Sequence, residues 1–207
     1  DPVTYVAKVS NTEPTTGGAD VEDDDTLKDR IYIAPSKYSV AGPEDAYYYW
    51  TRTYNANISD VLIYSENPAE VIVEFIMQGG ELPSESMRQG LQNFLANKQI
   101  RPLTDKVTVQ IPTTVNYQIN AKYFVNRSDL KKVDTIKAAV EKAVDEYVSW
   151  QQSKIGRDIN PSRLIQMMVG AGAKRVEIKL PEFQTIGKAN VAKLSGKTVE
   201  YGGLEDD

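Results

Sequence analysis

The sequence predicts an α+β protein made of two consecutive small α/β-sandwich modules with mainly antiparallel sheets. Some segments alternate apolar and polar residues, as strands do, and others repeat apolar residues at helical spacing. The predicted order is helix, strand, strand, helix, strand, and then strand, helix, helix, strand, strand, with the break near Pro112. We therefore expect a first module over residues 43–112 and a second over residues 113–207.

Residues 1–42 are expected to be the remnant of an upstream domain. The chain begins with Asp1 and Pro2 in place of Met, and its first residues alternate like a strand from Val3 to Val9. An acidic connector follows, and after it a short helix is expected from Asp25 to Ile31. The alternation at the very start is the reason to expect that a part of the protein lies upstream.

The first module is expected to open with a helix over residues 43–55, because Pro43 suits a first helical turn. The residues whose helical spacing puts them on the expected core face are Ala46, Tyr49, Trp50 and Thr53. Tyr48 then points away from the core, and Tyr47 beside it is expected to be partly exposed. Since tyrosine is enriched at protein contacts, Tyr47 and Tyr48 are the candidate residues of a partner interface.

The rest of the first module is predicted to be two strands, a helix and a third strand. Runs rich in β-branched residues at 60–66 and 70–78 flank a turn at Asn67 and Pro68, which is typical of a hairpin. Ser84 is a candidate N-cap for the helix that follows. The third strand is expected at residues 106–112.

The second module is predicted to begin with the clearest strand of the chain. Residues 115–125 alternate almost perfectly, which indicates one buried and one wet face. From Asp129 to about Gln152 the apolar period changes to 3.6, as expected of a long surface helix. The remaining elements are a short helix opened by Asn160 and Pro161 and two strands at 175–181 and 198–201.

Composition excludes several classes of chemistry. The 207 residues include neither Cys nor His, so thiol nucleophiles, histidine acid–base steps and imidazole or thiolate zinc sites cannot form within this chain. The formal net charge of −5 gives no basic surface for nucleic acid or an anionic membrane. No apolar run reaches the roughly 18 residues of a membrane span, and no signal peptide is visible. We expect no cofactor.

The acidic run after the glycine pair Gly17 and Gly18 is the first candidate for a metal site. An EF-hand loop that starts at Asp20 needs glycine in its sixth position and Glu in its twelfth, where this chain has Asp25 and Ile31. The template therefore fails. The interpretation we favour is a solvated turn leading into an acidic helix start, and an irregular calcium site stays the alternative.

Three other motifs have both a chemical and a structural interpretation. The stretch SGKT at 195–198 resembles the end of a phosphate-binding loop, but the required first glycine is Val191 and a strand follows, so Gly196 is expected to serve a turn. The aromatic run at 46–50 is either a stacking platform or core. Residues 156–158, Gly-Arg-Asp, are either a polar site between helices or a glycine-capped turn.

Several motifs, taken in their order along the chain, carry a family resemblance. They are NTEPTTGGADVEDDDTLKDRI, SVAGPEDAYYYW, SDVLIYSENPAEVIVEFIM, GGELPSESM, IRPLTDKVTVQIP, IGRDINPSRLI and VEYGGLEDD. Together they resemble the baseplate J-like proteins of contractile bacteriophage tails and related contractile injection machines, over nearly the whole chain from Val9. In this comparison the residues Gly17, Gly18, Asp20, Glu22 and Arg30 match a connector between an N-terminal part and the C-terminal modules.

The resemblance implies a structural role. Family members are wedge components that encircle the central hub and pass the trigger for sheath contraction outward. The implied partners are other wedge and hub proteins, with no nucleic acid, membrane or small-molecule substrate, and the implied location is the virion tail baseplate after assembly in the bacterial cytoplasm. The family supplies no catalytic residues, so no enzyme activity is expected.

A function of another class stays open at this point. Small sheets leave exposed edges that suit strand addition by neighbours, or self-association, which agrees with a wedge scaffold. The alternative is a tail-associated carbohydrate-acting enzyme or cell-wall binding module. A pair of carboxylates about 5 to 9.5 Å apart in a cleft would favour the enzyme.

Overall fold

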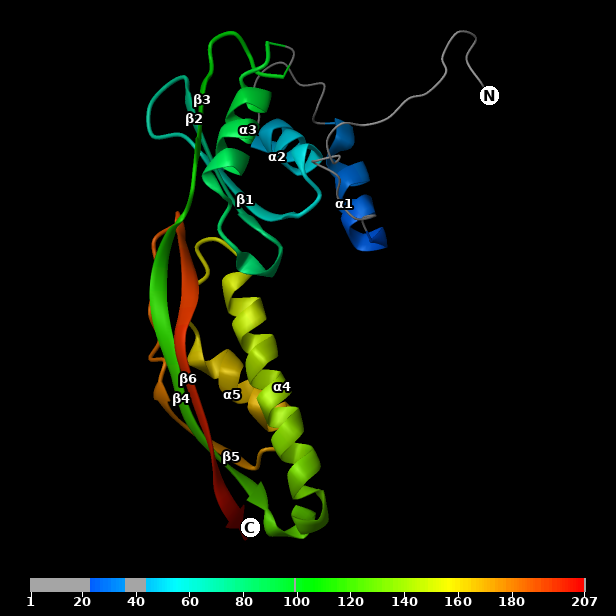
Figure 1. Ribbon diagram of the computed structural model, residues 1–207, viewed down its shortest axis with the longest axis vertical. Coiled ribbons are helices and arrows are strands. Elements are labelled where there is room, and N and C mark those ends of the chain that lie inside the picture. Colours follow the sequence, from blue (N-terminus) through cyan, green and yellow to red (C-terminus); the bar gives the residue numbers. More distant parts are fainter. Residues whose placement is uncertain (1–22, 36–43, 99, 207) are drawn as a thin grey trace, which may run out of the picture.

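The computed structural model describes residues 23–35, 44–98 and 100–206, and it is elongated, with two α/β layers stacked end to end (Figure 1). The first half contains α1 (Asp24–Ile33), α2 (Glu44–Tyr54), β1 (Ile58–Tyr64), β2 (Glu70–Met77), η2 (Gln78–Gly80), α3 (Glu85–Leu95) and β3 (Lys106–Gln110). The second half contains β4 (Thr113–Asn126), η3 (Arg127–Lys132), α4 (Val133–Gln152), α5 (Pro161–Gly170), β5 (Arg175–Leu180) and β6 (Asn190–Glu205). The α+β class predicted from the sequence is confirmed.

The first sheet has the strand order β1-β2-β3 and is covered on one face by α2 and α3 (Figure 1). Val73 and Phe75 alternate along β2 and are both fully buried against Leu91 and Leu95 of α3. The helix begins where the sequence predicts, since the Ser84 hydroxyl accepts the Met87 backbone N–H over 3.2 Å.

The second sheet has the strand order β5-β4-β6 and is covered on one face by α4 and α5. Every second residue of β4 from Tyr117 to Val125 is buried, and the residues between them lie on the opposite, more exposed face. The apolar stripe of α4, which includes Val140 and Val144, packs against the buried face of β4. The half-buried strand and the long helix expected from the sequence are therefore present.

The expectation of mainly antiparallel sheets is wrong, because both sheets are mixed. β1 and β5 pair antiparallel with β2 and β4, whereas the β2–β3 and β4–β6 pairs are parallel. In the first half, α3 lies between β2 and β3 and returns the chain to the end where β2 began. A helical return of this kind produces a parallel neighbour, whereas a tight hairpin produces an antiparallel one.

The last strand is much longer than the predicted 198–201. β6 spans Asn190–Glu205 and runs beside almost all of β4. Gly196 does not form the expected turn, since it pairs with Gln118, directly after a register shift that leaves Ser195 as an extra residue. The Ser195 hydroxyl donates to the Tyr117 carbonyl over 2.9 Å, so the irregularity is held by a hydrogen bond of its own.

Candidate functional site: the junction between the two sheets

The two halves of the chain meet in a small apolar cluster. Ile76 of β2, Ile155 in the loop after α4 and Val191 of β6 are all buried, and Leu62 of β1 packs against them. The cluster joins residues from both sheets, so separating the halves would expose apolar surface to water.

A side-chain hydrogen bond crosses the same junction. The Asp60 carboxylate of β1 accepts the Ile155 backbone N–H over 2.8 Å. Burial raises the pKa of Asp60, and this effect outweighs the Ile155 hydrogen bond and the nearby charges of Lys154 and Arg157, which act in the opposite direction. Asp60 therefore lies in a partly dehydrated place where its hydrogen bond is worth more than at an exposed surface.

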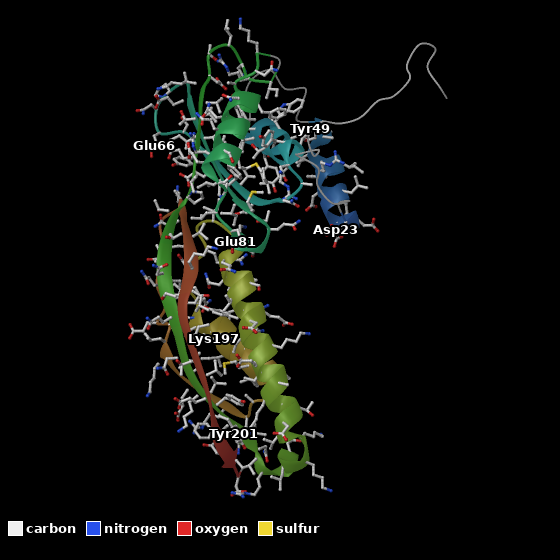
Figure 2. The ribbon with its side chains drawn as sticks, in the orientation of Figure 1. Asp23, Tyr49, Glu66, Glu81, Lys197 and Tyr201 are labelled. Atoms are coloured by element: carbon white, nitrogen blue, oxygen red, sulfur yellow. The ribbon has the colours of Figure 1, made fainter. Side chains whose placement is uncertain are left out.

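The backbone of the first half also touches the end of α4 directly. Gly80 in η2 has a φ of 71°, and a Cβ placed on it would lie 2.3 Å from the Gln152 carbonyl oxygen. Only glycine combines this left-handed conformation with such a close approach. Next to it, Glu81 (labelled in Figure 2) forms an ion pair with Lys193 of β6 at 3.6 Å.

The loop after α4 is held in place by a buried amide. Gln151 is fully buried, and its Nε2 donates to the carbonyl oxygens of Arg157 and Asp158 at 3.0 and 3.1 Å. The Arg157 guanidinium stacks 4.2 Å from the centre of the Trp150 ring, and an Asp158 oxygen accepts the Ile186 N–H over 2.9 Å. Residues 156–158 thus shape the loop that carries Ile155 into the junction.

These contacts define what the junction can do. An apolar cluster, a close backbone contact and a hydrogen bond each link the first half of the chain to the second. The sequence did not indicate Asp60, Gly80 or Gln151 as important, although the unusual pair Gly79–Gly80 directly after a strand was a local signal of a special backbone conformation.

The acidic run lies partly outside the described residues. Gly17, Gly18, Asp20 and Glu22 are not described, whereas Asp23 to Asp25 are exposed at the start of α1, where Figure 2 labels Asp23. Among the residues that the structure describes, no three His, Cys, Asp or Glu side chains come together as metal ligands. The acidic start agrees with the favourable interaction of carboxylates with a helix N-terminus.

The SGKT stretch forms part of a strand edge. Lys197, labelled in Figure 2, lies on β6. Its Nζ lies 2.6 Å from a carboxylate oxygen of Glu141 and 2.7 Å from one of Asp145, both on α4. The Lys197 ammonium group is therefore paired with two carboxylates, whereas the lysine of a phosphate-binding loop points at the nucleotide phosphates.

No helix in the described part of the chain is long and apolar enough to cross a membrane.

The expected phase of α2 is wrong at two positions. Tyr47 is only 2% exposed and its hydroxyl donates to Asp105 over 2.7 Å, whereas Thr53, expected in the core, is exposed. Tyr48 is partly buried and packs at the margin of the first core. The helix lies between α1, α3 and the sheet, so more than one of its faces is covered (Figure 1). A partner contact through Tyr47 and Tyr48 stays a prediction.

The geometry defines a two-part α+β protein whose parts are locked at one junction, and comparisons with known proteins place it in a family. Residues 39–111 match the baseplate J-like central domain and residues 117–202 match the baseplate J-like protein C-terminal domain. The chain belongs to the baseplate J-like family, which confirms the resemblance found in the sequence.

A relative agrees with this assignment, and a solved structure shares the fold. Baseplate protein J of Escherichia phage P2 is 32% identical over 162 residues, which cover 78% of this chain and 53% of that protein. The chain thus spans about half the length of this relative. A chain in the cryo-EM structure of the anti-feeding prophage baseplate, 6-fold symmetrised, has the same fold with a TM-score of 0.53 and 11% identity, and the match covers 84% of this chain and 42% of that one.

Proposed function

We propose that the protein is a structural component of a contractile phage tail baseplate, or of the baseplate of a related injection machine, and that it acts as a wedge scaffold. The observation that carries the proposal is the match, in the right order, to the central and C-terminal domains of the baseplate J-like family. Its partners are then other baseplate proteins and its location is the virion tail, after assembly in the bacterial cytoplasm.

The junction between the sheets supports a mechanical version of this role. We treat residues 43–112 and 113–207 as two modules, each with its own apolar core. The Asp60–Ile155 hydrogen bond and the contact of Gly80 with Gln152 oppose movement of one module relative to the other. A wedge protein that passes a movement outward needs a fixed orientation between its modules. If the modules could rotate freely about the junction, a displacement of one module would not displace the other.

A role without catalysis is part of the same proposal. A groove of about 500 Å³ beside β4 is lined by a single carboxylate, Glu182, whereas glycosidases normally use two. This favours the scaffold over the carbohydrate-acting enzyme that the sequence left open.

Localisation in the particle tests the proposal. Contractile tails isolated from the source should bind a gold-labelled antibody against this chain at the baseplate end, and the chain should sediment with the tails. Incubation of the purified chain with peptidoglycan should release no soluble sugar. Tails that assemble and contract normally when the chain is deleted would contradict the scaffold role, and sugar release would favour the enzyme.

A further inference from the structure

The first half of β4 has a strand neighbour on one side only. β6 pairs with β4 from Thr113 to Asn126, whereas β5 pairs with it only from Asn120 to Phe124. After Leu180 the chain leaves the sheet, and its next β-bridge joins Gln184 to Ile159 instead of to β4. The position beside Thr113–Ile119 that β5 would fill if it were longer therefore holds no strand from residues 23–35, 44–98 or 100–206.

The backbone groups that face this empty position can be identified. The Thr113 N–H donates to Ala189, just before β6, and the Tyr117 carbonyl accepts from Ser195 of β6, so both residues turn their backbone groups toward β6. Backbone groups alternate sides along a strand. Those of Thr114, Asn116 and Gln118 therefore face away from β6, and within the described chain no backbone hydrogen bond from the loops reaches them.

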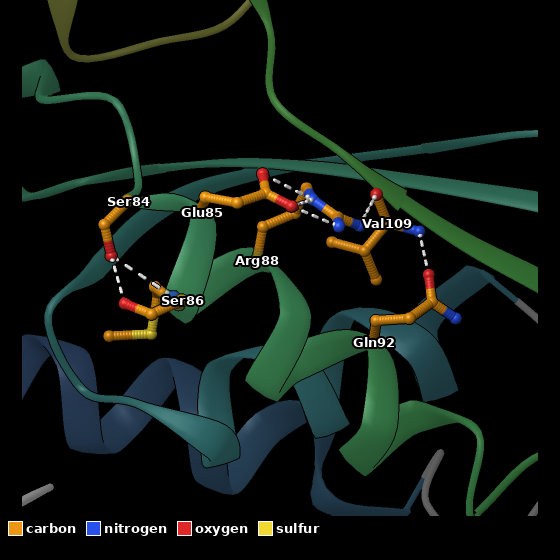
Figure 3. A network of polar contacts seen from close by, with 7 residues as sticks. Ser84, Glu85, Ser86, Arg88, Gln92 and Val109 are labelled. Carbon is orange, nitrogen blue, oxygen red and sulfur yellow. Dashed lines mark hydrogen bonds and ion pairs between the residues drawn. The ribbon is translucent and has the colours of Figure 1, made fainter.

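Other sheet edges are blocked by side chains or charges. Along β3, Gln92 of α3 donates to the Val107 carbonyl over 2.8 Å. Figure 3 shows two further contacts: Gln92 accepts the Val109 N–H over 2.7 Å, and Arg88 donates to the Val109 carbonyl over 3.1 Å. On β1, Arg52 donates to the Ser59 carbonyl over 2.9 Å. β5 and β6 carry several Lys, Arg and Glu residues, which discourage edge pairing.

The open part of β4 has none of these protections. The segment from Thr113 to Ile119 includes no charged residue. A groove of about 500 Å³ adjoins it, and its lining comes from residues 116–118 of β4, Ser195 of β6 and the segment Leu180–Gln184. Phe183 in that segment is 61% exposed and Leu180 is 38% exposed, so the groove has an apolar wall.

We propose that this slot binds an extended segment of another polypeptide, which adds as a strand beside Thr114–Gln118 in line with β5. The unpaired N–H and C=O groups select an extended backbone, and the wall of Leu180 and Phe183 accepts an apolar side chain. Glu182 lines the groove, so a Lys or Arg in the bound segment would complement its charge. That the segment belongs to a neighbouring baseplate protein rests on the proposed function, whereas the slot itself does not.

Selection from a random dodecapeptide library on the purified full chain tests the slot directly. Enriched peptides should alternate apolar residues and include a Lys or Arg. Asn116→Pro removes an N–H that faces the slot and leaves the hydrogen bonds between β4 and β6 in place. It should weaken peptide binding by about tenfold or more, because one backbone hydrogen bond to the peptide is lost and the proline ring hinders pairing of the added strand. Asn116→Ala keeps the N–H and loses only a side chain that lines the groove, so it should weaken binding clearly less than Asn116→Pro.

Amide hydrogen exchange on the wild-type chain supplies a measurement that needs no variant. In the free chain the Asn116 and Gln118 amides should exchange much faster than the Tyr117 and Ile119 amides, and bound peptide should slow only the first pair. Asn116→Pro with unchanged peptide affinity, or slow exchange of Asn116 and Gln118 in the free chain, would overturn the proposal. Binding of chito-oligosaccharides that Asn116→Ala abolishes would replace it with a sugar site. Neither result would affect the test of tail localisation.

Discussion

The Asp60 carboxylate and the Ile155 backbone N–H, 95 positions apart in the chain, form a 2.8 Å hydrogen bond that ties the first sheet to the loop after α4. Asp60→Ala should destabilise the protein by about 1 to 3 kcal/mol, because the Ile155 N–H loses its acceptor in a partly buried place. Asp60→Asn keeps an acceptor oxygen and should cost less. Urea unfolding of both variants measures the difference, and equal losses would mean that the hydrogen bond is unimportant.

The pH dependence of stability should also differ between wild type and Asp60→Asn. Burial raises the pKa of Asp60 in the folded state, so the folded protein binds this proton more tightly than the unfolded chain. The contribution of Asp60 to stability is then largest below its ordinary pKa and is lost as pH rises through the raised value. Thermal unfolding across about pH 3 to 7 should show that the stability of wild type relative to Asp60→Asn falls as the pH rises. A steeper decline in the variant would contradict the direction of the shift.

Alanine substitutions at two neighbouring glycines distinguish the cost of backbone strain from the cost of a steric clash at the junction. Gly79 and Gly80 both have a φ of 71°, but a Cβ on Gly79 meets no atom within 4 Å, whereas one on Gly80 lies 2.3 Å from the Gln152 oxygen. Gly79→Ala should cost only about 1 kcal/mol for the left-handed conformation. Gly80→Ala should cost about 3 kcal/mol or more, because α4 and η2 must move apart. Similar unfolding midpoints for the two variants would show that η2 and α4 can move apart at little cost in free energy.

A buried carboxylate in the first sheet offers a stabilising change. Glu74 is 3% exposed, its Oε1 accepts the Tyr64 hydroxyl over 3.1 Å, and its Oε2 has no partner. Burial raises its pKa, so the charged form is unfavourable. Glu74→Gln keeps the acceptor and removes the charge, and it should raise stability at pH 7 by about 1 kcal/mol, with a smaller gain near pH 4.

Tyr64→Phe is the matched control for the Glu74 variant. It removes only the hydroxyl that donates to Glu74 and should lower stability. Chemical unfolding at both pH values distinguishes the outcomes. If Glu74→Gln were as destabilising as Tyr64→Phe, the carboxylate would be making an interaction that depends on its charge.

Substitutions of the two tyrosines of α2 should have different effects on stability and on assembly. Tyr47→Ala should cost about 3 to 5 kcal/mol, because its ring is buried in the first core and its hydroxyl bonds Asp105. Tyr48→Ala should be milder for stability and, if Tyr48 contacts a partner, should reduce incorporation into tails. Melting temperature and tail incorporation measured together test this, and normal incorporation of folded Tyr48→Ala would place the contact elsewhere.

Local patterns in the sequence determined most of the elements. The alternation of 115–125, the 3.6-residue period before Gln152 and the caps Ser84 and Asn160 correctly predicted a strand, a long helix and two helix starts. The absence of His and Cys limited the chemistry, and the ordered motifs indicated the family. These properties depend on neighbouring residues, so one sequence is sufficient to show them.

Only the tertiary structure decided the direction of the strands, the length of β6, the buried faces of α2 and the junction. β6 is long because β4 provides hydrogen-bonding partners for residues such as Lys193 and Gly196, which do not alternate in an apolar pattern. Tyr47 is buried because α2 is covered on several sides, and Asp60 matters because Ile155 comes to lie beside it. Each of these depends on residues far apart in the chain, whose contacts local periodicity does not encode.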